Sequence, residues 1–84
     1  MYYMEFENHT YMAKLLPKDT AKNDLLYLYS RYKQATIGDC NISQPNSILN
    51  MKEYHKWNAW NNILGMTQDQ AKKEYINKVK ELHK

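Results

Sequence analysis

The 84-residue sequence has few of the residues that give small proteins covalent or metal-based stability. It has one cysteine, Cys40, two glycines and two prolines. A single cysteine excludes an internal disulfide framework, so packing alone must hold the fold, as is typical in a reducing compartment. No apolar run approaches bilayer-spanning length, and the N-terminal MYYMEFENHTY lacks the basic start and apolar centre of a secretory signal. We therefore expect residues 1–84 to form one soluble, cytoplasmic domain.

Groups that carry catalysis or bind metals are also scarce. His9, His55 and His83 fall in three different predicted helices without metal-ligand spacing, so we expect surface or edge histidines and no metal site. Cys40 follows Asp39, whose negative charge disfavours a thiolate. Two isolated glycines cannot build a phosphate loop or a nucleophile elbow. The sequence predicts a binding protein with no catalytic residue and no cofactor.

Charge is nearly balanced. Twelve Lys and Arg residues against nine Asp and Glu residues give a formal net charge of +3. This mild excess suits an anionic partner without requiring one.

Apolar periodicity near 3.6 residues and the near absence of strand alternation predict an all-α fold. Pro17 ends the first helix, while Gly38 and Gly65 suit the left-handed position after the second and third. Thr20 is the expected N-cap of the second helix, and Thr67 opens a capping box before the fourth. The expected helices run from about Met4 to Leu16, from Thr20 to Gly38, from about Met51 to Leu64, and onward from Thr67.

The same periodicity predicts which faces are buried. The expected stripes are Phe6, His9, Ala13 and Leu16 in the first helix, Trp57, Trp60 and Leu64 in the third, and Ala71, Tyr75, Val79 and Leu82 in the fourth. Four short amphipathic helices imply one bundle. The turn formers in GDCNISQPNS predict a long loop between the second and third helices.

One face of the second helix combines rings and a cation. Leu25, Tyr29, Tyr32 and Lys33 fall within an arc of roughly 100°. Tyrosine stacks on planar rings and lysine suits phosphate, so this face fits a nucleotide-like ligand. Lys56, in the third helix, offers a second cation from across the bundle. Ordinary packing with solvated lysines is the alternative, and geometry alone favours it.

The exact strings alter that balance. YSRYKQATIGD is followed by Pro45, KWNAW, Gly65 and AKKEYINKVKEL, and this series resembles the acyl-CoA-binding protein family from Phe6 to Leu82. The resemblance implies a four-helix up-down-down-up bundle that binds, sequesters and transports long-chain fatty acyl-CoA esters without catalysis. It also implies a monomer that contacts acyl-CoA-consuming enzymes or membranes transiently and binds no nucleic acid.

The resemblance implies roles for individual residues. Tyr29 matches the tyrosine that stacks on adenine, and Lys33 the lysine that reaches the ribose 3'-phosphate. Lys56 matches the other phosphate-binding cation. The remaining expected ligand contacts are Tyr32 as a wall of the site, Tyr75 lining the acyl groove, Lys14 near the head group, and Leu25.

The chain departs from the family pattern at three places. Gln44-Pro45-Asn46 replaces the usual Arg-Pro-Gly, and the segment between Pro45 and Trp57 has one extra residue. Leu64 stands where lysine is common, and the MYYMEF start is unusually aromatic. We expect these changes to affect loop geometry and acyl-chain preference.

Two other functional classes stay open. Interleaved tyrosines and cations are typical of single-stranded nucleic-acid binding, but the cations here form no continuous stripe. A peripheral membrane bundle is less favoured, because the amphipathic faces are needed for the core.

Overall fold

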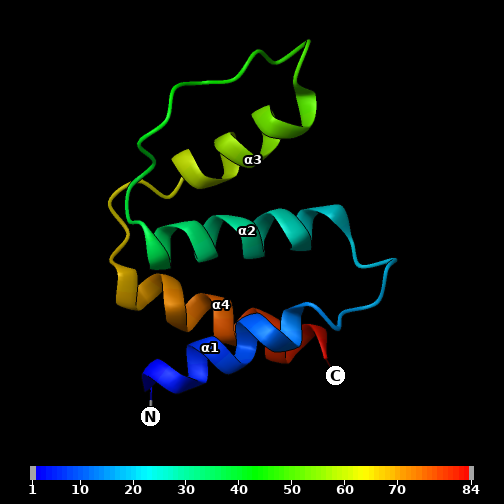
Figure 1. Cartoon of the computed structure of the whole chain (residues 1–84), viewed down its shortest axis with the longest axis vertical. Coiled ribbons are helices and arrows are strands. Elements are labelled where there is room, and N and C mark those ends of the chain that lie inside the picture. The colour runs from blue at the N-terminus through cyan, green and yellow to red at the C-terminus, as the bar shows by residue number, and fades with distance from the viewer. Residues whose placement is uncertain (1, 84) are drawn as a thin grey trace.

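The computed structural model describes residues 2–83, with side chains from residue 5 onward, and no strand occurs among them. Its helices are α1 (Tyr2–Ala13), α2 (Lys22–Thr36), α3 (Met51–Asn61) and α4 (Gln68–Leu82). α1 and α4 run in one direction, and α2 and α3 run in the opposite one (Figure 1). This is the expected all-α, up-down-down-up arrangement. Of the aromatic side chains in the amino-terminal MYYMEF segment, those of Tyr2 and Tyr3 lie outside the described part, and that of Phe6 lies within it.

The helices are arranged as a shallow layer in the order α3, α2, α4, α1 (Figure 1). α2 packs against α3 and α4, and α4 packs against α1. The molecule measures 39 × 30 × 15 Å along its principal axes. α2 is therefore the central helix, with α3 along one side and α4 along the other.

The hydrophobic core lies between α1, α2 and α4. The stripe of α4 is buried as expected, with Ala71 and Val79 at 0% exposure, and the α1 stripe buries Phe6 and His9. His9 is therefore not the surface or edge histidine that we expected; its Nδ1 lies 2.7 Å from the Glu5 carbonyl oxygen. The buried core cluster comprises Phe6, Leu28, Ala35, Ala71, Tyr75, Ile76 and Val79.

The two tryptophans of α3 hold the long loop that precedes it. Trp60, 1% exposed, donates its indole N–H to the Gly38 carbonyl at 2.9 Å. Trp57 donates to the Ile42 carbonyl at 3.0 Å. Leu64, expected in the same stripe, lies beyond the end of α3 and is 61% exposed. The two tryptophans therefore fix the loop by hydrogen bonds as well as forming a packing surface of α3.

Asp39 joins the end of α2 to the turn before α4. Its Oδ1 accepts hydrogen bonds from the Gln34 side-chain amide and the Gly65 backbone N–H, each at 2.8 Å. Gln34, fully buried, also donates to the Met66 carbonyl at 2.8 Å. Gly38 and Gly65 have φ values of 104° and 93°. Both glycines therefore occupy the left-handed region expected after a helix.

Two N-cap residues were predicted from the sequence, and the structure confirms one of them. Thr67 caps α4, since its Oγ1 accepts from the Gln70 N–H at 3.1 Å. The Gln70 side chain does not complete the predicted capping box, because its amide donates to Glu74 at 3.0 Å. Thr20 does not cap α2. The N-cap is Ala21, whose side chain has no acceptor, and the Thr20 hydroxyl instead donates to the Pro17 carbonyl at 2.6 Å. The bond to Pro17 closes the turn between α1 and α2, so the hydroxyl does not serve the helix end.

Candidate ligand-binding site

A hollow of about 230 Å³ lies between the first turns of α2 and α3. We call it the α2–α3 hollow. Leucines 25 and 26 form an apolar surface within it, and cationic side chains stand around them. Its lining residues are Lys22, Leu25, Leu26, Tyr29, Lys52, His55 and Lys56.

Tyr29 stands at the rim of this hollow with two ammonium groups near its ring. The Lys56 Nζ lies 4.9 Å from the ring centroid, and the Lys33 Nζ lies 5.9 Å from it. Lys33 is also 5.6 Å from the Trp60 ring. Each distance is within the range of a cation–π contact. The structure therefore brings together Tyr29, Lys33 and Lys56, as the sequence led us to expect, with Leu25 alongside.

The electrostatics keep the Tyr29 hydroxyl protonated. Burial raises the pKa of Tyr29, and the negative charge of Glu53 raises it further. Glu53 also forms an ion pair with Lys56, with Oε2 and Nζ 3.6 Å apart. Tyr29 is thus a neutral ring with a hydroxyl that donates, and an incoming anion would compete with Glu53 for Lys56. The arrangement can hold a molecule with a planar ring, phosphates and an apolar chain.

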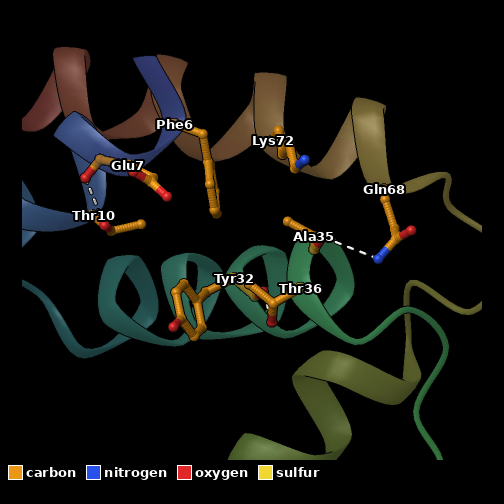
Figure 2. Close-up of a pocket in the computed structure, with 8 residues that line it drawn as sticks. All are labelled: Phe6, Glu7, Thr10, Tyr32, Ala35, Thr36, Gln68 and Lys72. Atoms are coloured by element: carbon orange, nitrogen blue, oxygen red, sulfur yellow. Dashed lines mark hydrogen bonds between the residues drawn. The ribbon is translucent and has the colours of Figure 1, made fainter. Parts of the chain in front are cut away.

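A second hollow, of about 560 Å³, lies on the other side of α2, against α1 and α4. We call it the α1–α2–α4 hollow. Tyr32 lines it and is 42% exposed. Figure 2 shows Phe6 of α1 pointing across the hollow toward α2, with Lys72 and Gln68 on α4. The Phe6 and Tyr32 rings are stacked, with centroids 6.2 Å apart and planes at 20°. Tyr29 and Tyr32, close in sequence, therefore face different hollows.

Tyr75 and Lys14 stand apart from the Tyr29 group. Tyr75 is 5% exposed and packs its ring edge-on against Phe6 at 5.3 Å, with Tyr32 at 6.2 Å. Burial raises the pKa of Tyr75 to about 12. It lies in the core beneath the aromatic pair and is not among the residues that line either hollow. Lys14 is exposed just after the end of α1 and also lines neither hollow.

Four lining residues of the α2–α3 hollow were not predicted from the sequence. They are Lys22, Leu26, Lys52 and His55. Helical spacing carried a signal for two of them, because Lys52 is one turn before Lys56 and Lys22 is one turn before Leu25. His55 shares a face of α3 with Lys52, three residues before it, and only the packing of α3 against α2 shows that this face is turned toward the hollow.

Other kinds of site are not found in the part of the chain that the structure describes. Within residues 2–83, no group of three or more His, Cys, Asp or Glu side chains could hold a metal ion. None of the described helices is long and apolar enough to span a membrane.

Comparison with known proteins places this chain in a family. The family model described as "Acyl CoA binding protein" matches residues 4–79. The chain is 45% identical over 78 residues to an acyl-CoA-binding protein of Gossypium hirsutum, covering 93% of this chain and 86% of the relative. It is 44% identical over 77 residues to one of Saccharomyces cerevisiae, covering 92% and 87%.

Solved structures agree with the sequence relatives. The crystal structure of Oryza sativa acyl-CoA-binding protein 2 superposes with a TM-score of 0.94 at 40% identity, covering 98% of this chain and 88% of that one. The corresponding protein from Moniliophthora perniciosa gives a TM-score of 0.89 at 32% identity, with coverages of 98% and 80%.

Proposed function

Because this chain belongs to the acyl-CoA-binding protein family, we propose that it binds long-chain fatty acyl-CoA esters non-covalently, sequesters them from water and membranes, and transports them to the enzymes that consume them. The observation that carries the proposal is the ring of Tyr29, flanked by Lys33 and Lys56, at the rim of an apolar hollow. The three features match the three parts of the ligand: a planar base, phosphates and a hydrocarbon chain.

The acyl chain occupies the α2–α3 hollow in this proposal. Leu25 and Leu26 supply apolar surface there, and Leu25 is 47% exposed. Each buried methylene contributes about 0.8 kcal/mol, so a long chain contributes on the order of 10 kcal/mol before ordering costs are subtracted. The acyl chain therefore supplies most of the affinity.

The head group supplies the specificity. We assign adenine to the ring of Tyr29 and phosphates to Lys33 and Lys56. Both ammonium groups now lie near that ring, so ligand binding exchanges a cation–π contact for a stacked base and moves each cation onto a phosphate. Lys22 and Lys52 extend the cationic rim. A free fatty acid offers a carboxylate to the lysines but neither the planar base nor the phosphates.

The remaining predicted contacts take indirect or peripheral roles in this proposal. Tyr32 walls the far side of α2, where the head group extends across the exposed face of the helix. Tyr75 supports the position of Tyr32 through their ring contact. This role replaces the lining of the acyl groove that the family resemblance implied. Lys14 adds positive charge just after the end of α1. That end and the start of α2 lie on the same side of the molecule (Figure 1).

We further propose that residues 1–84 act as one acyl-CoA-binding domain, as a monomer in the cytoplasm, without catalysis and without a cofactor. The Tyr29 group supports a binding role, since it combines cations that suit phosphates with a neutral phenol ring that can stack on a planar base. The single cysteine suits a reducing compartment.

Native mass spectrometry of the protein purified from cells tests the proposal. We expect bound species with the masses of acyl-CoA esters. Co-purified nucleic acid, or protein that carries no acyl-CoA even after incubation with palmitoyl-CoA, would contradict it.

A further inference from the structure

The connection between α2 and α3 ends in an exposed apolar surface. Ile48 and Leu49 are each 83% exposed, and Met51, the first residue of α3, is 59% exposed. We call these three residues the apolar tip. The connection projects from the layer just before α3 begins (Figure 1). Single exposed apolar residues are ordinary, but three within four positions at a projecting tip indicate an interaction site.

The tip has a defined shape. The Asn46 side-chain Oδ1 accepts hydrogen bonds from the backbone N–H groups of Ile48 and Leu49, each at 2.8 Å. The Asn46 carbonyl accepts a further bond from the Asn50 N–H at 3.0 Å. These bonds close the turn that leads into α3 and hold both apolar side chains outward. The exposure is thus built into the turn and costs little extra ordering when the tip binds.

Cations surround the base of the tip. Lys52 follows Met51 directly, and Lys22 and Lys56 stand with it around the α2–α3 hollow. The acidic group in the same turn of α3 is Glu53, which is paired with Lys56 at 3.6 Å. The surface next to the tip therefore carries a net positive charge.

We propose that the apolar tip inserts into the surface of an anionic lipid bilayer while the neighbouring lysines contact lipid phosphates. Apolar side chains that project above a lysine rim fit such a surface, where each nearby lysine adds favourable energy. A protein partner fits less well, because lysine is depleted at protein interfaces. The membrane contact belongs to a loop tip, so the amphipathic helix faces remain in the core. Docking in this orientation brings the mouth of the α2–α3 hollow to the lipid, where acyl-CoA would be exchanged.

The purpose of this contact rests on the proposed function, but its test needs no acyl-CoA. Co-sedimentation of the full chain with sucrose-loaded vesicles measures binding to equal parts phosphatidylserine and phosphatidylcholine, and to phosphatidylcholine alone. We expect binding to the anionic vesicles that weakens with added salt, and little binding to the neutral ones. The double variant Ile48→Ser, Leu49→Ser should bind the anionic vesicles about tenfold more weakly or worse.

Leu64→Ser is the matched control, because Leu64 is 61% exposed and lies beyond the opposite end of α3. It should bind vesicles like the unmodified chain. Titration with palmitoyl-CoA in solution separates the two proposals, since the tip variant should lose vesicle binding and keep acyl-CoA binding. The membrane proposal is overturned by no binding to anionic vesicles, by equal binding to both vesicle types, or by equal losses in the tip and Leu64 variants. Each of these outcomes leaves the acyl-CoA proposal standing.

Discussion

At the scale of single residues, the ring of Tyr29 is where the proposed ligand and the protein's own cations meet. Two ammonium groups lie within 6 Å of its centroid, at 4.9 and 5.9 Å. Burial and the charge of Glu53 raise the pKa of its hydroxyl. Because the hydroxyl stays protonated at neutral pH, stacking and hydrogen-bond donation are both available to a bound nucleotide.

Reversing the charge of either cation should damage binding without damaging the fold. Lys33→Glu and Lys56→Glu should each weaken acyl-CoA binding by a factor of roughly 10 to 100, because a charge-assisted contact to phosphate is replaced by repulsion. Isothermal titration measures the affinity, and circular dichroism checks the helix content and melting. Lys73→Glu, at an exposed position on α4, is the control and should bind normally. Unchanged affinity in both site variants would remove these lysines from the site.

Substitution of Tyr29 separates stacking from hydrogen bonding. Tyr29→Phe keeps the aromatic face and should retain most of the affinity, whereas Tyr29→Ala removes the ring and should lose considerably more. The same titration compares the two variants. Equal losses would show that stacking is not the main role of this side chain.

Glu53 competes with the proposed ligand for Lys56, so removing its charge should strengthen binding. Because exposed ion pairs contribute about 0–1 kcal/mol, Glu53→Gln should tighten acyl-CoA binding by up to about fivefold. Glu81→Gln, in an exposed ion pair of α4 with Lys78, controls for the general change in net charge. Weaker binding by Glu53→Gln would contradict this account of the pair.

At the scale of elements, the loops around α3 are fixed by a few polar bonds. The Trp60 indole holds the start of the α2–α3 loop, and Asp39 joins that start to the α3–α4 turn. α3 packs against α2 alone among the described helices. The position of α3, and with it the shape of the α2–α3 hollow, therefore depends on these bonds.

The bond from Trp60 is removed by substitution with phenylalanine, which also leaves a small cavity where the larger buried indole was. Trp60→Phe keeps an aromatic ring but leaves the Gly38 carbonyl without its indole donor. We expect a loss of about 1–3 kcal/mol in the free energy of unfolding, measured by urea denaturation. Trp57→Phe should cost less, because Trp57 is only half-buried. A larger loss at Trp57 would reverse the ranking of the two anchors.

The bonds to Asp39 predict a pH dependence of stability. The Gly65 backbone N–H, and then the Gln34 amide, lower the pKa of Asp39. A carboxyl with a lowered folded-state pKa stabilises the fold above its unfolded pKa of about 3.9, and this contribution is lost as pH falls through the folded value. The stability difference between the unmodified chain and Asp39→Asn should therefore shrink as the solution is acidified below about pH 4. A difference that stays constant with pH would show that the charge of Asp39 contributes nothing.

The approximate ends of the helices could be predicted from the sequence. The detailed structure of their first and last turns could not always be predicted. Pro17, the two glycines and the Thr67 cap placed the helices within a few residues of their observed ends, because these residues restrict the backbone wherever they occur. The prediction that Thr20 caps α2 failed because its hydroxyl has several backbone partners within reach. In the structure it donates to the Pro17 carbonyl. Local sequence does not decide between such partners.

Sequence periodicity could group the residues of the candidate site only within a single helix. The arc on α2 follows from helix periodicity, but Tyr29 and Tyr32 fall on opposite sides of its exposed ridge and face different hollows. Which hollow each residue faces depends on how α3 and α4 pack against α2. The burial of Tyr75 and the contribution of His55 likewise depend on that packing.

At the scale of the whole molecule, the layered order of helices gives the protein two open grooves beside one central helix. A bundle closed around an axis would bury the face of α2 that carries Tyr29 and Tyr32. Here the core of α1, α2 and α4 supports that face from one side, and α3 completes the apolar hollow on the other. In the proposed complex the head group contacts Tyr29, Lys33 and Lys56, and the acyl chain lies against Leu25 and Leu26 in the hollow that Tyr29 and Lys56 also line.

This division of labour is tested most directly by calorimetric titration with CoA, a free fatty acid and acyl-CoA esters of increasing chain length. The thioester should bind far more tightly than either part, because joining the parts makes the second contact intramolecular. Each added methylene should strengthen binding by up to about 0.8 kcal/mol until the hollow is filled, after which the gain should level off. If the free fatty acid bound as tightly as its CoA ester, the protein would be a general lipid carrier and the roles of Tyr29, Lys33 and Lys56 would be wrong.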